Sequence, residues 1–257
     1  MPDIVSLFNG LLHFSVTSDL EKYRVESILT KEPETIAWID GWEVEDRNSV
    51  FYDIGANIGI YSIYASFKHR NLDVFSFEPV LNNYVALQQN IWLNQYLKVN
   101  PVHLAISNNA SYVNLYLSDT RVGNSGAQID QAINERGESF EALRVEKILS
   151  ITLDRLISDF NFPVPTYVKI DVDGHETDIL NGMTQTLEAP NLKSLLVEFN
   201  SDAEFAHWRD RFKAVGLSVD TRYDDLPNHS RIRRVSKGTL ARNYIFSRVS
   251  VGACLTD

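Results

Sequence analysis

The chain has 257 residues, of which 44% are hydrophobic and 23% charged, and its formal net charge is −10. This length suits one large α/β domain with a substantial core. A negatively charged protein repels phosphate backbones and anionic lipids, so the charge argues against nucleic acid or a membrane surface as a partner. A short basic run is interpreted as a solvated loop; it contains Arg231, Arg233, Arg234 and Lys237.

Cys254 is the single cysteine, so the chain can form neither an internal disulfide nor a zinc site with several cysteines. The N-terminal sequence MPDIVSLFNGLLHFSV carries Asp3 and lacks a basic leader and a small-residue cleavage site, which argues against a signal peptide. No run reaches the ~18 apolar residues that a membrane span needs. We therefore expect a cytoplasmic protein without a membrane span.

Residues 1–48 are expected to form an N-terminal helical cap. Ser18 with the following aspartate can cap a helix that runs to about Thr30, where a Lys-Glu-Pro sequence ends it. Trp38 and Trp42 precede the first strand of the next region. They either wall a cleft or pack in the core.

Residues 49–257 alternate between strand and helix patterns. Short runs rich in β-branched and aromatic residues are typical of strands buried on both faces of a parallel sheet. They are SVFYDI, DVFSFE, VNPVHLAI, TYVKID and KSLLVEFN, followed by LSVDTRY and NYIFSRV. Helices are expected at 81–97 and, after a Ser-Asp cap, at 201–215. This order predicts a doubly wound, Rossmann-like α/β domain with a mostly parallel sheet, whose last strand, near 243–249, is antiparallel.

Residues 119–147 interrupt this alternation. They are polar and contain three glycines, DTRVGNSGAQIDQAINERGESFEALRVEK. Long irregular insertions in compact domains are usually functional or disordered. We expect a loop near the functional site.

A glycine turn follows the first strand of this domain. Asp53 ends the strand, and Gly55 and Gly59 flank Ala56 and Asn57. Glycine permits a positive φ and lets a ligand approach the backbone, and asparagine tolerates the left-handed conformation. The turn lacks the middle glycine of the dinucleotide fingerprint, and a carboxylate inside it disfavours a phosphate. The turn therefore suits a cationic or neutral ligand.

The next two strand ends add candidate ligand contacts. Glu78 ends the second strand, where an acidic residue can accept hydrogen bonds from both ribose hydroxyls. After the third strand, the sequence LAISNN places small and polar residues where an adenine edge could be read.

Several segments, in order, resemble the FkbM family of class I S-adenosylmethionine-dependent methyltransferases. They are DIGANIGIYS, FSFEPVLNNYVALQQNIWLN, LAIS, ITLDRLI, VKIDVDGHETDILNGM and LLVEFN, between about residues 50 and 200. The resemblance implies a seven-stranded class I fold and O-methylation, often of a sugar hydroxyl in a glycan, glycolipid or natural product. It also implies that the turn receives the methionine part of S-adenosylmethionine and Glu78 its ribose. The implied cofactor contacts are Asp53, Gly55, Ala56, Asn57, Gly59, Glu78, Pro79, Ala105, Ser107 and Asp171.

The segment TYVKIDVDGHETDIL concentrates ionisable groups at the end of a strand, as active sites of this fold do. An alcohol oxygen needs a base or a metal to accept or displace its proton before it attacks a methyl group. The candidate catalytic residues are Lys169, Asp171, Asp173 and His175, and Glu198 and Asn200 on the next strand end could complete the set. Asp173 and His175 depart from the family pattern, which usually has glutamate and a small residue there. That departure affects the identity of the acceptor more than methyl transfer itself.

Other interpretations of these residues stay open. Lys169 can simply pair with an aspartate, His175 can be an exposed residue of a helix first turn, and Glu176 can shape the turn. A divalent metal on Asp171, Asp173 and Glu198 is possible by ligand type but is not predicted. The rival functions are methylation of a non-sugar metabolite or lipid, an NAD-dependent oxidoreductase, and a non-catalytic cofactor-binding module. The expected partner is a small-molecule or glycan acceptor.

Overall fold

The computed structural model describes residues 2–44, 48–134, 136–227, 229 and 242–248. The basic run between Arg231 and Lys237 and the lone Cys254 lie outside these residues. What the sequence predicts for them therefore stays a prediction.

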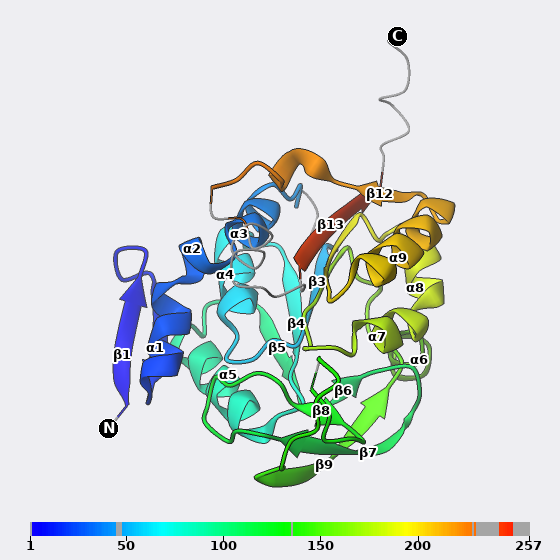
Figure 1. The fold of residues 1–257 in the computed structure, drawn as a ribbon. Helices are drawn as coiled ribbons and strands as arrows, with labels where there is room; N and C mark the ends of the chain where they lie inside the picture. The colour runs from blue at the N-terminus through cyan, green and yellow to red at the C-terminus, as the bar shows by residue number, and fades with distance from the viewer. Residues whose placement is uncertain (1, 45–47, 135, 228, 230–241, 249–257) are drawn as a thin grey trace.

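Seven strands of the described chain form one sheet in the spatial order β12-β13-β11-β10-β3-β4-β5 (Figure 1). They are β3 (Val50–Ile54), β4 (Asp73–Phe77), β5 (Val99–Val102), β10 (Tyr167–Ile170), β11 (Ser194–Phe199), β12 (Leu217–Val219) and β13 (Arg242–Arg248). The pairs from β5 to β11 are parallel, whereas β13 runs antiparallel to both β11 and β12. The predicted doubly wound, mostly parallel sheet is confirmed, as is its antiparallel strand near the C-terminus.

Helices cover both faces of this sheet, because its strands are buried on both sides. Phe51 packs with α3 (Pro33–Asp40) and α4 (Ile60–Lys68), and its neighbour Tyr52 belongs to the core on the opposite face. That second core receives α6 (Leu153–Phe160), α7 (Glu176–Asn181), α8 (Thr184–Glu188) and α9 (Asp202–Ala214). Successive residues of a strand thus pack into two separate cores, one on each face of the sheet. Helix α5 (Leu81–Leu93) packs on β5 and β2, and a short 3₁₀ helix spans Thr221–Tyr223.

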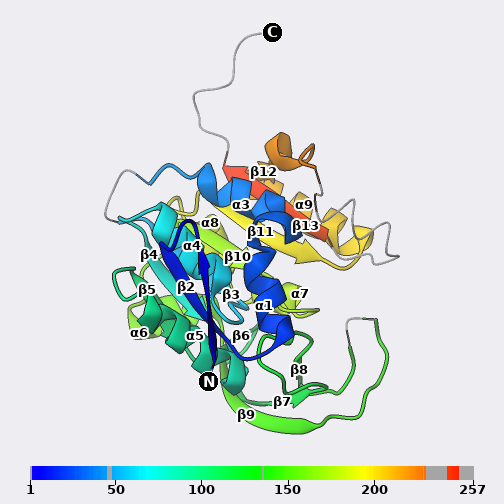
Figure 2. The same cartoon turned by 90° about the vertical axis from the view of Figure 1, so that its left-hand side faces the viewer.

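The N-terminal segment begins with a hairpin that the predicted helical cap did not include, and helices follow it. Strands β1 (Asp3–Leu7) and β2 (Leu12–Val16) pair antiparallel, and they precede α1 (Asp19–Glu26) and α2 (Ile28–Lys31). Asn9 and Gly10 adopt φ values of 58° and 80°, which suit a tight turn. Leu12 and Phe14 alternate inward and are fully buried. The hairpin and α1 lie at one side of the domain and face the viewer in Figure 2.

The predicted cap at Ser18 is confirmed, since its side chain accepts the N–H of Glu21 at 3.2 Å. The helix ends at Glu26 rather than near Thr30, and Pro33 starts α3 instead of only ending the previous helix. Both tryptophans pack in the core. Trp38 donates its indole N–H to Ser194 at 2.9 Å, and the Trp42 ring stacks on Tyr167 with 4.2 Å between centroids.

A second, four-stranded sheet lies below the large one in Figures 1 and 2. It contains β6 (Ala105–Ile106), β7 (Ser111–Leu117), β8 (Gln128–Ile129) and β9 (Arg144–Ile151) in the order β6-β9-β7-β8. The expectation of one strand over 99–106 was wrong, because the chain leaves the large sheet after Val102. The expectation of an irregular loop over 119–147 was also wrong in part, since β8 and the start of β9 lie there. The sequence signal for this second sheet was the alternation of buried and more exposed residues in SYVNLYL, the sequence of β7, in which Val113 and Leu115 are buried.

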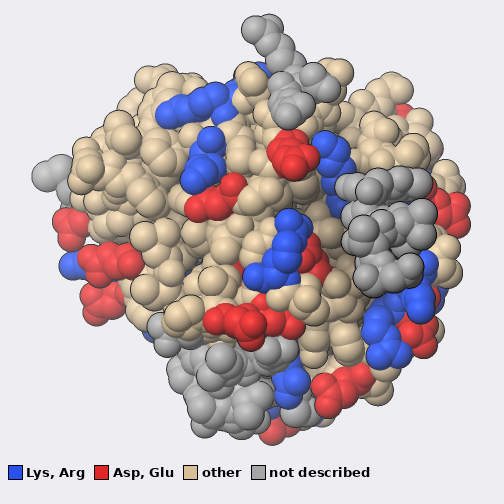
Figure 3. All heavy atoms as spheres, turned by 90° about the horizontal axis from the view of Figure 1, so that it is seen from above, with Lys and Arg blue, Asp and Glu red and all other residues tan. Residues whose placement is uncertain are grey.

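The surface seen from above carries basic and acidic side chains interspersed among uncharged ones (Figure 3). Among the helices that the structure describes, none has the length and apolar character that crossing a bilayer requires.

Candidate active site

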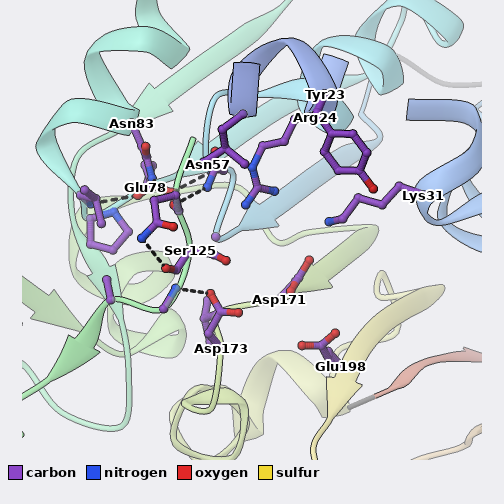
Figure 4. Close-up of a pocket in the computed structure, with 18 residues that line it drawn as sticks. Tyr23, Arg24, Lys31, Asn57, Glu78, Asn83, Ser125, Asp171, Asp173 and Glu198 are labelled. Carbon is purple, nitrogen blue, oxygen red and sulfur yellow. Dashed lines mark hydrogen bonds between the residues drawn. The ribbon is translucent and has the colours of Figure 1, made fainter. Parts of the chain in front are cut away.

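A cavity of about 320 Å³ opens beyond the carboxyl ends of β3, β4, β10 and β11 (Figure 4). This is the place where an open parallel sheet binds its ligand, beside the point where strand order reverses. We call it the main cavity. Four carboxylates line it, Glu78, Asp171, Asp173 and Glu198. Side chains of α1 and α2 and the loop 124–127 complete its wall.

The glycine turn forms part of this wall through Gly55 and Asn57. Gly55 has a φ of 83°, and a Cβ built on it would lie 2.1 Å from the carbonyl oxygen of Asp171. Glycine is therefore required for the close approach of the turn to the end of β10. Asn57 is also left-handed, with a φ of 53°. Ala56 and Gly59 do not line the cavity; Gly59 precedes the first residue of α4.

Glu78 faces the cavity and also holds the turn in place. Its Oε2 accepts the backbone N–H of Asn57 at 2.7 Å, and its Oε1 accepts that of Val80 at 2.9 Å. Burial raises the pKa of Glu78 to about 7, although these hydrogen bonds oppose the change. The neighbouring Pro79 lines the cavity, and its predicted contact with the cofactor stays a prediction.

Asp53 lies beneath the cavity rather than in its wall. Its side chain is 1% exposed, and its Oδ2 accepts the hydroxyl of Ser62 at 2.5 Å. Burial raises its pKa, although the ammonium of Lys169 lies 3.9 Å from Oδ1. A direct contact between Asp53 and a cofactor stays a prediction.

Lys169 and Asp171 form an ion pair at the end of β10, with 2.9 Å between Nζ and Oδ2. Lys169 is buried and does not line the cavity, whereas Asp171 does. Burial raises the pKa of Asp171, but the charges of Lys169 and Lys31 and the hydrogen bond from Lys169 together bring it below its ordinary value. Lys169 also lies over the ring of Tyr61, 5.2 Å from its centroid. The lysine therefore stabilises the charge of Asp171 from below the cavity floor.

Asp173 lines the main cavity in a left-handed backbone conformation, with a φ of 58°. Its Oδ2 accepts the N–H of Gly126 at 2.8 Å, and its carbonyl oxygen accepts the side-chain amide of Gln128 at 2.9 Å. Strained backbone of this kind is concentrated at functional sites. Asp173 therefore joins the end of β10 to the loop across the cavity.

His175 does not line the main cavity. It contacts a smaller, mostly apolar side pocket of about 40 Å³ instead. Its Nε2 accepts the N–H of Ile129 at 3.2 Å, and burial lowers the pKa of the ring. Glu176 accepts the N–H groups of Val172 and Gly174, so it shapes the turn, and burial raises its pKa to about 7.

The side pocket adjoins the main cavity through shared wall residues such as Gly55 and Pro79. Ala105 lines the side pocket, and its predicted contact with the cofactor stays a prediction. Ser107 does not line either pocket, and its N–H donates to the carbonyl of Ile151.

Sequence reasoning missed several wall residues of the main cavity: Tyr23, Arg24, Lys31, Asn83 and Asn124. Tyr23, Arg24 and Lys31 come from helices that precede the recognised motifs, and Asn124 comes from the insertion. Asn83 lies within a recognised motif, but its spacing from the other wall residues follows no rule. Only the position of the insertion near the site was anticipated. Asn200, which the sequence suggested beside Glu198, is not part of the wall.

Within the described residues, no group of three or more His, Cys, Asp or Glu side chains could hold a metal ion. The carboxylates of Asp171, Asp173 and Glu198 therefore share the cavity without forming a ligand set.

Comparison with known proteins shows the family of the chain. A family model described as the methyltransferase FkbM domain matches residues 53–219, which is more than half of the chain. The chain is 25% identical over 203 residues to the hexuronic acid methyltransferase AglP of Haloferax volcanii, covering 79% of this chain and 76% of the relative. It is 23% identical over 183 residues to methyltransferase 1 of Beauveria bassiana, covering 67% and 73% of the two chains.

Among solved structures, an S-adenosylmethionine-dependent methyltransferase from Agrobacterium tumefaciens matches with a TM-score of 0.47 and 10% identity, over 95% of this chain and 69% of that one. The family match, and not this structural likeness, carries the assignment. It covers the glycine turn, Glu78 and the carboxylates at the ends of β10 and β11. The chain belongs to the FkbM family of class I S-adenosylmethionine-dependent methyltransferases.

Proposed function

We propose that the protein transfers the methyl group of S-adenosylmethionine to a hydroxyl oxygen of a sugar. The observation that carries this proposal is the main cavity, where carboxylates from adjacent strand ends face a space of about 320 Å³. Carboxylates can bind the hydroxyls of a ribose and of a sugar and can accept a hydroxyl proton. The relative from Haloferax volcanii, named as a hexuronic acid methyltransferase, supports a sugar acceptor.

The cavity residues suit this cofactor in charge and in shape. S-adenosylmethionine, when bound, supplies an electrophilic methyl group on a sulfonium centre and also carries an ammonium group. Asp171 offers an ionised carboxylate to the cationic part, because Lys169 keeps its pKa low. Glu78 would accept the ribose hydroxyls. The side pocket, walled by Ala105 and Pro79, would take the adenine ring.

Asp173 is the residue we assign as the base. Its carboxylate would accept the proton of the acceptor hydroxyl, while bound S-adenosylmethionine would supply the methyl group to that oxygen and leave as S-adenosylhomocysteine. Asp171 is a poor base, because the ammonium of Lys169 donates to it at 2.9 Å and contributes to a pKa below the ordinary value. His175 faces the side pocket and uses its Nε2 to hold Ile129, so it positions the loop rather than reaching the acceptor. Glu198 lies across the cavity on the end of β11 and would orient acceptor hydroxyls.

The test is calorimetric titration with S-adenosylhomocysteine, followed by transfer of a labelled methyl group to a panel of sugars, alcohols and lipids. We expect micromolar binding that Glu78→Ala weakens at least tenfold, and product only with sugars. Tight binding of NAD in place of S-adenosylhomocysteine would contradict the proposal. Transfer to lipids or non-sugar alcohols alone would retain the enzyme class and reject the sugar acceptor.

A further inference from the structure

Among the described residues, the wall of the main cavity includes two cationic side chains in addition to its carboxylates. Arg24 of α1 and Lys31 of α2 line the wall across from Asp171 and Glu198 (Figure 4). Lys31 pairs with the buried Glu32 at 2.9 Å, and its side chain stays 27% exposed. Arg24 has no carboxylate within 4 Å among the described residues. A guanidinium in a concave site without such a partner is available to an anion.

Arg24 is held in place through its side-chain stem. Its Nε donates to the carbonyl oxygen of Gly123. A Cβ on Gly123 would lie 3.6 Å from Cδ of Arg24, so the loop packs directly on the arginine. The N–H of Gly123 in turn donates to the side chain of Asn83 at 2.8 Å. With Nε occupied, the two terminal nitrogens are the donors left to face the cavity, and their planar geometry matches a carboxylate or a phosphate.

We propose that Arg24 and Lys31 bind an anionic group of the acceptor, so that the acceptor is an acidic sugar bearing a carboxylate or a phosphate. This inference rests on the proposed sugar methyltransferase function. The observation that supports it is the separation of charge within the cavity, where the carboxylates lie at the strand ends and the cations lie on the N-terminal helices. An acceptor bound with its anion on Arg24 and Lys31 points its remaining hydroxyls toward Asp173 and Glu198. The N-terminal helices then decide which sugar is accepted.

The alternative ligand of Arg24 and Lys31 is the carboxylate in the methionine part of the cofactor. The two uses differ in what a substitution changes. If Arg24 serves the acceptor, Arg24→Gln leaves cofactor affinity intact and removes the preference for acidic sugars. If it serves the cofactor, the same substitution weakens the binding of S-adenosylhomocysteine.

The experiment measures binding to the full chain saturated with S-adenosylhomocysteine, by ligand-observed NMR titration. The probes are methyl β-glucuronoside, glucose 1-phosphate and the neutral methyl β-glucoside. We expect at least one acidic probe to bind tenfold or more tightly than the neutral one, and the stronger of the two identifies carboxylate or phosphate as the group recognised. Arg24→Gln should remove most of this preference, Arg24→Lys should restore part of it, and Lys31→Gln should reduce it.

Lys22→Gln is the matched control, since Lys22 lies on the same helix, pairs with Glu26 at the surface and does not line the cavity. It should change nothing. Equal binding of all three probes, no binding of any, or loss of S-adenosylhomocysteine affinity in Arg24→Gln would each overturn the inference. Failure of the wild type to bind S-adenosylhomocysteine would instead reject the proposed function. In that case the probes are titrated in the absence of S-adenosylhomocysteine. Preferential binding of the acidic probes would then still support an anion-binding site at Arg24 and Lys31, and equal binding would reject it.

Discussion

The backbone N–H of Asn57 donates a 2.7 Å hydrogen bond to Oε2 of Glu78, so the turn after β3 and the acid that ends β4 form one unit. Residues that are 21 apart in the sequence are thereby fixed relative to each other. The same carboxylate faces the main cavity. Any change in its protonation therefore acts on ligand binding and on the turn together.

The first prediction concerns pH. Burial raises the pKa of Glu78 to about 7, and its ionised form is the better acceptor for ribose hydroxyls. Affinity for S-adenosylhomocysteine should therefore rise with pH up to about 7 and level off above it, by up to about tenfold per unit. Calorimetry between pH 5.5 and 8.5 measures this. Glu78→Gln should abolish the dependence.

Glu176→Gln is the control for this pH effect. Burial also raises the pKa of Glu176 to about 7, but its side chain shapes the turn after β10 and does not line the main cavity. The variant should retain the pH dependence of binding. If it loses the dependence while Glu78→Gln keeps it, the assignment to Glu78 is wrong.

The second prediction concerns the turn glycine. Gly55→Ala places a Cβ 2.1 Å from the carbonyl oxygen of Asp171 at a φ of 83°. Gly10→Ala has nearly the same φ, 80°, with no heavy atom within 4 Å. The control should cost about 1 kcal/mol of unfolding free energy from backbone strain alone. Gly55→Ala should cost about 1–3 kcal/mol more because the end of β10 must move.

Urea unfolding measures both glycine variants. Gly55→Ala should also weaken binding of S-adenosylhomocysteine, since Asp171 lines the cavity, whereas Gly10→Ala should not. Equal losses of stability in the two variants would show that the close approach at Gly55 carries no cost of its own.

The third prediction concerns the buried cation. Lys169→Met removes the charge beside Asp171 and Asp53, and so leaves the buried carboxylate of Asp53 and the partly buried carboxylate of Asp171 without it. Breaking a buried pair from one side costs about 3–5 kcal/mol. Lys68→Met, which breaks a surface pair with Asp40, should cost less than about 1 kcal/mol. Thermal and urea unfolding compare the two.

A second substitution separates this effect from a general loss of packing. Lys169→Met combined with Asp171→Asn should recover part of the stability, because one of the uncompensated charges is then gone. If the losses of unfolding free energy from Lys169→Met and Asp171→Asn simply add in the double variant, the two side chains have no coupling energy.

The fourth prediction concerns the base. Asp173→Asn keeps the shape of the side chain, and asparagine tolerates the φ of 58° at this position. It should lower kcat by about 10²–10⁴. His175→Gln should lower kcat less than about tenfold and act mainly on KM, because His175 holds the loop at Ile129. Steady-state kinetics of both variants, with the acceptor that the methyl-transfer panel identifies, measure these effects. The reverse ranking would assign the base to His175.

The sequence by itself determined the strand-helix order of the main domain and the ends of the strands that carry the site. Buried parallel strands are short apolar runs, and the residues just after them must meet at one edge of the sheet. The sequence alone therefore places Gly55, Glu78, Asp171 and Asp173 together. The N-terminal hairpin and the second sheet were missed because short alternating strands give a weaker signal than buried ones.

Tertiary structure alone decided which of these side chains reach the cavity. Asp53 and Lys169 lie on the same strand ends as the wall residues but point beneath its floor, and His175 turns into the side pocket. Arg24 and Lys31 enter the wall from helices that precede the first strand of the large sheet. Their positions follow from how α1, α2 and the loop at Gly123 pack together. Such contacts depend on packing between segments that are far apart in the sequence, so local sequence pattern does not predict them.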